Sequence, residues 1–200
     1  MFTKVCGLRT PSDVAVAVAA GADAVGFVFA ESARKVTVDQ ARALAAEVPP
    51  TVLTVGVFAG IPAETAASMT QDAGLAAIQL HGDYPRESFA ALADLPVKLI
   101  RATALGPETE LATGAWGEDL LLLDSPVAGS GERWNLSTLD NRRPTGDWLL
   151  AGGLTPDNVA TAIAAAHPWG VDVSSGVESS RGVKDPDLIR AFLSAARAAP

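Results

Sequence analysis

Eight short apolar runs, rich in Val, Leu, Ile and Phe, recur along the 200-residue chain. They lie at residues 3–6, 24–29, 52–58, 77–80, 97–101, 120–124, 148–151 and 170–173. The runs read as continuously apolar and not as an alternation with polar residues, which is typical of parallel strands buried on both faces. Eight is also the number of parallel strands that closes into a (β/α)8 barrel.

Most segments between these runs have the signals of a helix, namely a capping residue or a proline at the start. We predict helices at residues 13–20, 38–47, 62–74, 86–93, 156–166 and 186–198. Ser12 is the expected cap of the first helix and Thr37 that of the second. The connections at 105–117 and 137–146 contain Gly, Pro and polar residues, so we expect only a turn of helix in each.

The fold class predicted from this order is α/β, a small (β/α)8 TIM barrel with shortened fifth and sixth helices. An open doubly wound sheet is the alternative, but that architecture rarely uses eight strands in so short a chain. No linker, low-complexity stretch or block of charge marks a boundary, so residues 1–200 are expected to form a single domain.

Composition excludes several classes of function. No apolar run approaches the roughly 18 residues that a membrane span needs, and the N-terminus lacks the layout of a secretory signal. We therefore expect a cytoplasmic protein that contacts no membrane. The net charge of −8 argues against a nucleic-acid partner. One cysteine and two histidines argue against a disulfide and a metal site.

In a barrel, the residues at the carboxyl ends of the strands form the active face. Polar and small residues occupy these positions at 6–7, 31–34, 79–83, 101, 124, 152–153 and 172–176. The Gly-Gly pair after the seventh run and the Ser-Ser-Gly run after the eighth expose backbone N–H groups, which favours a phosphate site. The alternative is that Gly152 and Gly153 only turn the chain into the next helix. No P-loop or GxGxxG pattern is present.

Three side chains at strand ends are candidates for chemistry. Asp124 ends the run of four leucines, where a buried carboxylate is costly, so it is either hydrogen-bonded structurally or catalytic, and we favour catalysis. Cys6 is either an inert core residue or functional. His81 is either a hydrogen-bonded structural residue or part of the site.

Basic side chains offer a second set of candidates. Arg34 and Arg101 each either clamp a carboxylate or a phosphate or simply lie on the surface, and Arg34 is favoured for the site because it closes a loop of small residues. Lys98 begins its strand and Lys184 lies well past its own, so neither is placed for Schiff-base chemistry.

The motifs at the strand ends form a recognisable set. In order they are KVCGL, SARKV, VGVF, QLHGD, LLLDS, a GSG loop, AGGLTPDNV and VDVSSGVE. Together they resemble the phosphoribosylanthranilate isomerase family of tryptophan biosynthesis, from Lys4 to Phe192, with a looser match at the fifth strand. The resemblance implies a small (β/α)8 barrel without a cofactor, and a monomer.

The resemblance also implies an activity, the Amadori rearrangement of N-(5′-phosphoribosyl)anthranilate to 1-(2-carboxyphenylamino)-1-deoxyribulose 5-phosphate. Asp124 matches the family's general acid and Cys6 its general base. Arg34 matches the arginine that faces the anthranilate carboxylate. The remaining matched positions are His81 and Asp172 for the substrate, and Gly152, Gly153, Ser174, Ser175 and Gly176 for the phosphate.

The chain departs from the family pattern in three loops. Trp134, Asn135 and Leu136 follow the GSG loop, where the family usually has phenylalanine, aspartate and tryptophan. Ala33 replaces a common proline, and residues 59–60 replace a Val-Asn pair. These changes affect the shape of the loops and not the acid–base pair, so they bear on substrate fit.

Other readings remain. The bifunctional isomerase that also serves histidine biosynthesis is longer and two-fold repetitive, and it has an aspartate where Cys6 stands. A paralogue recruited for a modified anthranilate is a second possibility. A non-catalytic barrel that binds a sugar phosphate is the third, although a binding protein needs neither Cys6 nor Asp124.

Overall fold

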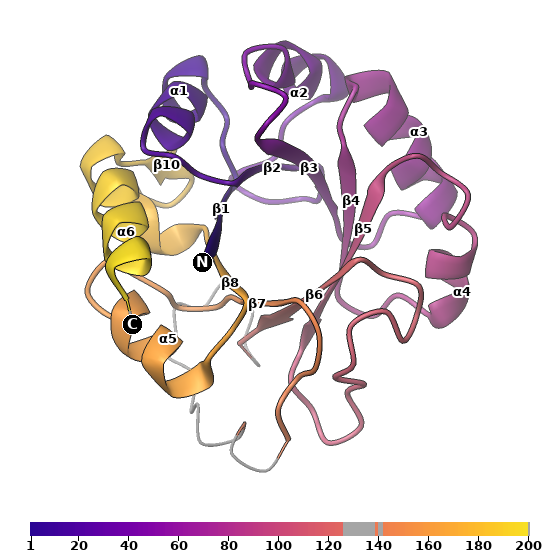
Figure 1. The fold of residues 1–200 in the computed structure, drawn as a ribbon. Coiled ribbons are helices and arrows are strands. Elements are labelled where there is room, and N and C mark those ends of the chain that lie inside the picture. The colour runs from indigo at the N-terminus through magenta and orange to yellow at the C-terminus, as the bar shows by residue number, and fades with distance from the viewer. Residues whose placement is uncertain (126–138, 140–141, 200) are drawn as a thin grey trace.

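The computed structural model describes residues 1–125, 139 and 142–199. Parallel strands form a closed barrel in chain order, and β8 pairs with β1 to complete the ring (Figure 1). The barrel strands are β1 Phe2–Cys6, β2 Ala24–Val28, β3 Leu53–Phe58, β4 Ala77–His81, β5 Lys98–Ala104, β6 Leu120–Asp124, β7 Trp148–Leu150 and β8 Gly170–Val173. Each predicted apolar run overlaps one of them, so the predicted barrel is confirmed.

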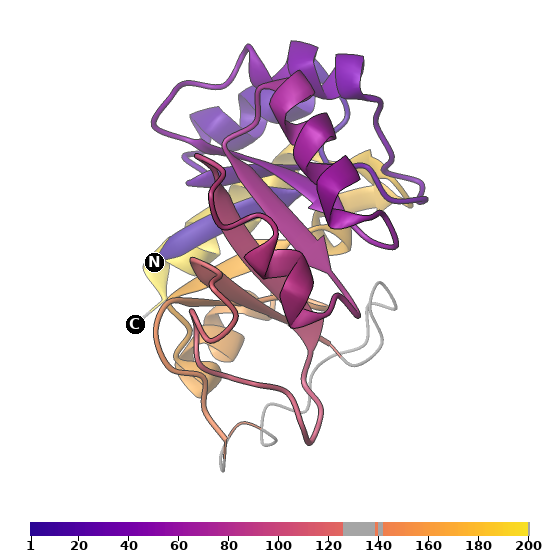
Figure 2. The same cartoon turned by 90° about the vertical axis from the view of Figure 1, so that its right-hand side faces the viewer.

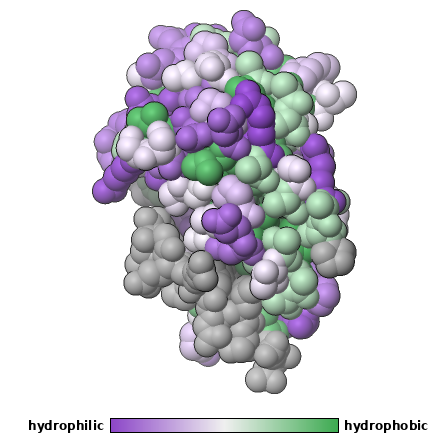
Figure 3. All heavy atoms as spheres, turned by 90° about the vertical axis from the view of Figure 1, so that its left-hand side faces the viewer, coloured by the Kyte–Doolittle hydropathy of each residue, from purple (hydrophilic) through white to green (hydrophobic). Residues whose placement is uncertain are grey.

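Helices surround the barrel on its outside (Figures 1 and 2). They are α1 Pro11–Ala19, α2 Val38–Ala45, α3 Ala63–Ala73, α4 Arg86–Ala90, α5 Val159–Ala166 and α6 Pro186–Ala198. The last of them, α6, buries Phe192 and Leu193 against the barrel and turns Arg190 outward. Polar residues accordingly cover much of this side of the molecule, with a band of apolar residues along its right-hand edge (Figure 3).

The predicted cap of α1 is wrong. Thr10, and not Ser12, caps this helix, because its hydroxyl accepts the Asp13 N–H at 3.1 Å. Pro11 fits the first turn, where its missing N–H costs nothing, and the helix therefore begins before Ser12. The predicted cap of α2 is confirmed, since Thr37 forms a capping box with Gln40.

The connection between β5 and β6 contains turns and no helix, so the turn of helix predicted within residues 105–117 is wrong. Gly114 and Gly117 both have positive φ, at 87° and 89°, which an α-helix does not accommodate. Residues 137, 138, 140 and 141 of the predicted sixth helical segment lie outside the described residues. In the part of the chain that the structure describes, no helix is long and apolar enough to cross a membrane.

A short antiparallel hairpin follows the barrel and was not predicted. After β8 the chain forms a 3₁₀ turn, η2 Ser175–Val177, and then the strands β9 Glu178–Ser180 and β10 Val183–Lys184. The segment is mostly polar, so the search for apolar runs does not find it. Gly182 permits the tight turn between the strands, with φ at +82°.

The interior of the barrel is mainly apolar, with Val55, Leu122 and Leu149 among its buried residues. A charged pair is also buried there. The Lys4 side chain is fully buried, and its Nζ donates to Asp172 Oδ1 at 2.8 Å. The register places these two residues opposite each other on β1 and β8. Each charge is therefore neutralised by its partner inside the barrel.

Arg101 stabilises the connection that lacks a helix and does not line the active-site cavity. Its Nε donates to buried Glu118 Oε1 at 2.7 Å, and its Nη2 donates to the carbonyl oxygen of Glu110 at 3.0 Å. Its guanidinium also lies 4.8 Å from the ring centre of Trp116. These contacts hold the segment between β5 and β6 in place of helix packing, which explains a buried arginine in the middle of β5, and not at its end as the apolar run predicted.

We expect Arg101→Met to lower the free energy of unfolding by about 3–5 kcal/mol, because Glu118 would remain buried without its cation. Urea denaturation measures this change. The matched control, Arg190→Met, breaks an exposed ion pair with Asp187 and should cost less than about 1 kcal/mol. The double variant Arg101→Met/Glu118→Leu should be more stable than Arg101→Met alone, and the reverse order would contradict the assignment.

Candidate active site

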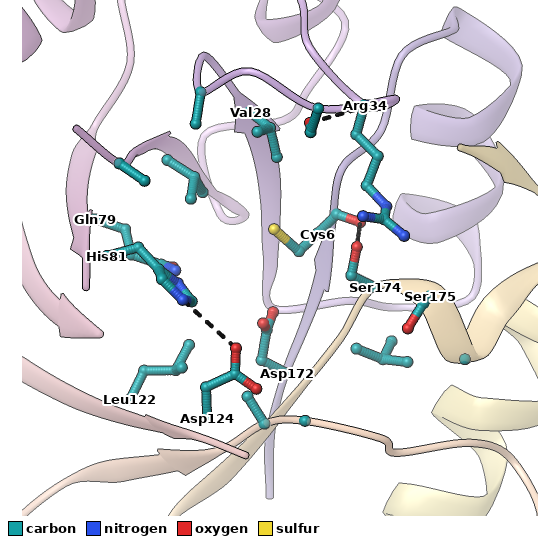
Figure 4. A pocket seen from close by; sticks show the side chains of 18 of the residues that line it. Cys6, Val28, Arg34, Gln79, His81, Leu122, Asp124, Asp172, Ser174 and Ser175 are labelled. Atoms are coloured by element: carbon teal, nitrogen blue, oxygen red, sulfur yellow. Dashed lines mark hydrogen bonds and ion pairs between the residues drawn. The ribbon is translucent and has the colours of Figure 1, made fainter. Parts of the chain in front are cut away.

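A cavity of about 360 Å³ opens at the carboxyl ends of the barrel strands, and this volume suits a small-molecule ligand (Figure 4). All ten residues that the family resemblance assigned to the site line this one cavity, and Arg101 does not. They are Cys6, Arg34, His81, Asp124, Gly152, Gly153, Asp172, Ser174, Ser175 and Gly176. They come from six strands, β1, β2, β4, β6, β7 and β8, and the loops that follow them, which the closed barrel brings to one end.

Cys6 ends β1 and points its sulfur into the cavity (Figure 4). Gly26 on β2 makes room for it, since a Cβ at that position would lie 3.0 Å from the Cys6 Sγ. Burial raises the pKa of the Cys6 thiol, and the nearby Asp172 carboxylate adds to this. The ammonium groups of Lys4 and Lys184 oppose the rise.

Asp124 ends β6 on the other side of the cavity, with its carboxylate beside His81 (Figure 4). Its Oδ2 lies 3.5 Å from the His81 Nε2, and its Oδ1 accepts the Ser125 N–H at 2.7 Å. Burial raises the pKa of Asp124, although His81 and the Ser125 N–H both lower it. A carboxyl group with a raised pKa holds its proton closer to neutral pH, which is what a general acid requires.

Gly152 does more than turn the chain. It follows β7 with φ at +83°, and a Cβ there would lie 2.6 Å from Asp124 Oδ1 and 2.4 Å from the Ser125 nitrogen. A side chain at this position would therefore displace the carboxylate. The two strand ends approach this closely only because residue 152 is glycine.

The loops after β7 and β8 form a concave surface of backbone N–H groups. Within the described residues, no hydrogen bond occupies the backbone N–H of Gly153, Ser175 or Gly176. Gly176 also allows the two loops to pack, because a Cβ there would lie 1.8 Å from the carbonyl oxygen of Leu154. Free N–H groups that line a cavity are suited to bind an anion such as a phosphate.

Arg34, in the loop after β2, is held by an acidic residue to which the sequence analysis gave no role. Its Nε donates to Glu178 Oε1 at 2.6 Å and its Nη2 to Glu178 Oε2 at 2.9 Å. Glu178 also accepts from Lys184 Nζ and from the Gly182 N–H, each at 2.9 Å. Burial alone would raise the pKa of Glu178, but these hydrogen bonds lower it to about 2.

The sequence analysis also assigned no role to Lys4 and Gln79 inside the barrel. Each stands two residues before a candidate, Cys6 or His81, on the same strand, so the two-residue period of a strand places it on the same face. Gln79 is buried at the floor of the cavity, and its Oε1 has no hydrogen-bond partner among the described residues. The two-residue period of the strand, counted back from Cys6 and from His81, is the signal that would have identified both residues.

Trp134, Asn135 and Leu136, where the chain departs from the family pattern, lie outside the described residues together with the GSG loop. Over the described ranges, no group of three or more His, Cys, Asp or Glu side chains is arranged to hold a metal ion.

This fold and this site define a class of protein. The chain is a (β/α)8 barrel with a protonatable carboxyl and a thiol facing one cavity, next to a surface that accepts an anion. This arrangement is suited to acid–base chemistry on a phosphorylated small molecule.

Comparison with known proteins identifies the family. Residues 3–195 match the model of the N-(5′-phosphoribosyl)anthranilate (PRA) isomerase family. The N-(5′-phosphoribosyl)anthranilate isomerase of Symbiobacterium thermophilum is 42% identical, over 98% of each chain. The crystal structure of TrpF from Jonesia denitrificans is 50% identical, with a TM-score of 0.92 over 100% of this chain and 98% of that one.

A third relative was solved with a ligand. This phosphoribosyl anthranilate isomerase, in complex with reduced 1-(o-carboxyphenylamino)-1-deoxyribulose 5-phosphate, is 33% identical, with a TM-score of 0.84 over 98% of both chains. The chain belongs to the PRA isomerase family. The predicted enzymatic activity, the PRA isomerase reaction of tryptophan biosynthesis, is confirmed.

Cys6 is the chain's one cysteine, so its titration is directly measurable by alkylation. We expect the rate of reaction with iodoacetamide to rise with pH through a midpoint above 9.0, the ordinary thiol value, because burial disfavours the thiolate. Mass spectrometry at a series of pH values measures this rate, with N-acetylcysteine as the reference thiol. A midpoint at or below that of the reference would contradict the effect of burial.

Proposed function

We propose that Asp124 and Cys6 are the general acid and general base of the isomerisation. Asp124 protonates the ring oxygen of the ribose, the bond from C1′ to that oxygen breaks, and the nitrogen lone pair forms a Schiff base. The thiolate of Cys6 then removes the C2′ proton, and the electron pair of that C–H bond forms the enolamine.

Tautomerisation completes the reaction. The 2′-hydroxyl gives up its proton as C1′ gains one, which leaves the ketone. Cys6 has gained one proton and Asp124 has lost one, so exchange with solvent restores both groups. The positive nitrogen of the Schiff base acidifies the C2′ proton, so a modest base is sufficient. The position of the two groups in one cavity, with burial raising the pKa of Asp124, is the observation that best supports these roles.

We assign the two ends of the substrate to separate parts of the cavity. Arg34 binds the anthranilate carboxylate, and Gly152, Gly153 and residues 174–176 bind the phosphate. The free N–H groups of that surface support the phosphate site. The relative solved with a reduced product analogue supports the class of ligand. Because the chain has a net charge of −8, these local donors must hold the substrate without long-range attraction.

His81 and Asp172 complete the proposed substrate site. His81 is placed to orient the Asp124 carboxyl, because its Nε2 lies 3.5 Å from Oδ2. Asp172 uses Oδ1 to bind Lys4, so its second oxygen is the one we assign to the sugar hydroxyls.

We further propose that the chain acts in the cytoplasm and as a monomer, without a cofactor. The family resemblance implies the monomer, and the dimeric relative from Thermotoga maritima represents the alternative. Sedimentation equilibrium at micromolar concentrations tests it, and a mass of twice 20.5 kDa would overturn it.

We expect Asp124→Asn and Cys6→Ala each to lower kcat by about 10²- to 10⁴-fold, the usual contribution of general acid–base catalysis. The assay generates N-(5′-phosphoribosyl)anthranilate in situ and follows the loss of its fluorescence. Binding of the reduced product analogue should change only slightly in both variants. Near-normal turnover by either variant would refute the role of that residue.

Asp124→Asn should not lower the melting temperature at pH 7. Burial raises the pKa of Asp124, so the folded state loses stability as the pH rises from the ordinary value of 3.8 through the raised pKa. Above the raised pKa this cost is fully present, and asparagine removes it. A clear fall in the melting temperature would show that the ionised carboxylate stabilises the fold.

We expect Arg34→Ala to raise KM by about 10-fold or more with a smaller change in kcat. The variant removes a charged hydrogen bond that binds the ground state and the transition state of the substrate equally. Steady-state kinetics in the same fluorescence assay measure both constants. A large fall in kcat at unchanged KM would instead indicate that Arg34 acts mainly in the transition state.

A further inference from the structure

The β9–β10 hairpin contacts the loop that contains Arg34 through side chains. Both oxygens of Glu178 accept from the Arg34 guanidinium, at 2.6 and 2.9 Å, and the Glu178 side chain is only 4% exposed. A buried bidentate pair of this kind fixes the plane of the guanidinium as well as its position. Arg34 is thus held in one orientation.

The same hairpin contacts the same loop through the backbone. A Cβ at Gly182 would lie 2.7 Å from the carbonyl oxygen of Ala33, so the turn packs directly on the residue before Arg34. Arg9 joins the two backbones, because its Nη1 donates to the carbonyl oxygens of Ala33 at 2.6 Å and of Gly182 at 3.4 Å. These contacts do not depend on Glu178.

Lys184 links this cluster to the loop after β8. Its buried Nζ donates to Glu178 Oε1 at 2.9 Å and to the carbonyl oxygen of Ser174 at 2.8 Å. Two cations, Arg34 and Lys184, thus share the Glu178 carboxylate. These three side chains together carry one net positive charge. That charge is suited to an anionic group in the cavity.

Glu178 decides which part of the guanidinium remains available. The edge formed by Nε and Nη2 is occupied by the carboxylate. Within the described part of the chain, no hydrogen bond occupies Nη1 of Arg34. Arg34 lines the cavity, so the edge formed by Nη1 and Nη2 is the one left for a ligand carboxylate.

We propose that Glu178 is a positioning residue that orients Arg34 and thereby sets the preference of the cavity for a substrate with a carboxylate on its aromatic ring. This inference rests on the proposed role of Arg34. It adds the hairpin as a determinant of specificity, although Glu178 itself contacts no substrate.

Two matched probes test the proposal. Reductive amination of ribose 5-phosphate with anthranilate produces a probe with the carboxylate, and aniline produces the same probe without it. We expect Glu178→Gln to weaken binding of the anthranilate probe by about 10- to 100-fold, the range for a hydrogen bond to a charged group. Binding of the aniline probe should change less than about 2-fold. Titration calorimetry measures both affinities.

The control is Asp187→Asn, which makes the same change in charge at an exposed position on α6. It should leave both affinities unchanged. With N-(5′-phosphoribosyl)anthranilate as substrate, Glu178→Gln should raise KM with a smaller change in kcat. Unaltered binding of the aniline probe also shows that the variant is folded. If Glu178→Gln does not fold, Glu178→Asp is the second variant, since it keeps the charge but moves the carboxylate away from Arg34. It should likewise weaken binding of the anthranilate probe more than binding of the aniline probe.

The outcomes distinguish a failure of the inference about Glu178 from a failure of the proposed role of Arg34. Equal losses for both probes would mean that Glu178 is merely structural, and unchanged affinity for both would mean that it does not position Arg34. Either result overturns the inference. If Arg34→Ala discriminates between the probes and Glu178→Gln does not, only the role of Glu178 fails. If Arg34→Ala does not discriminate between them, the proposed role of Arg34 fails as well.

Discussion

The pairing of β1 with β8 closes the barrel, and the rest of the structure depends on it. Its register places Lys4 opposite Asp172, two charges that the interior accepts only as a pair. The same strands end at Cys6 and lead into Ser174, whose hydroxyl donates to the Cys6 carbonyl oxygen at 3.2 Å. The closure of the ring, the buried ion pair and the proposed base therefore belong to one arrangement.

The cavity separates two electrostatic environments. Around Cys6 and Asp124, which face the cavity from β1 and β6, burial raises the pKa of both groups. Around Arg34 and Lys184, hydrogen bonds from these two cations and from the Gly182 N–H outweigh burial and lower the pKa of Glu178 to about 2, and the two cations with this one carboxylate retain a net positive charge. In the proposed mechanism the first environment transfers protons and the second holds an anion. A chain with a net charge of −8 concentrates positive charge locally at this site.

Much of the architecture was predictable because buried parallel strands are apolar throughout, and such runs are visible without a structure. The site was predictable for a related reason, since polar residues at strand ends converge once a barrel is assumed. The predictions that were wrong also have physical causes. Thr10 replaces Ser12 as a cap because Pro11 fits the first turn, and Arg101 is buried because Glu118, seventeen residues later, folds back to pair with it.

By itself, the sequence determined the order of strands and helices and the identity of the residues at the strand ends, because these depend on local periodicity. Only the tertiary structure decided which distant charges meet. Lys4 and Asp172 are 168 residues apart, and Arg34 and Glu178 are 144 apart, so no local pattern relates them. The closed ring brings the first and last strands together. That closure places Glu178 against Arg34 and leaves one edge of the guanidinium available at the cavity.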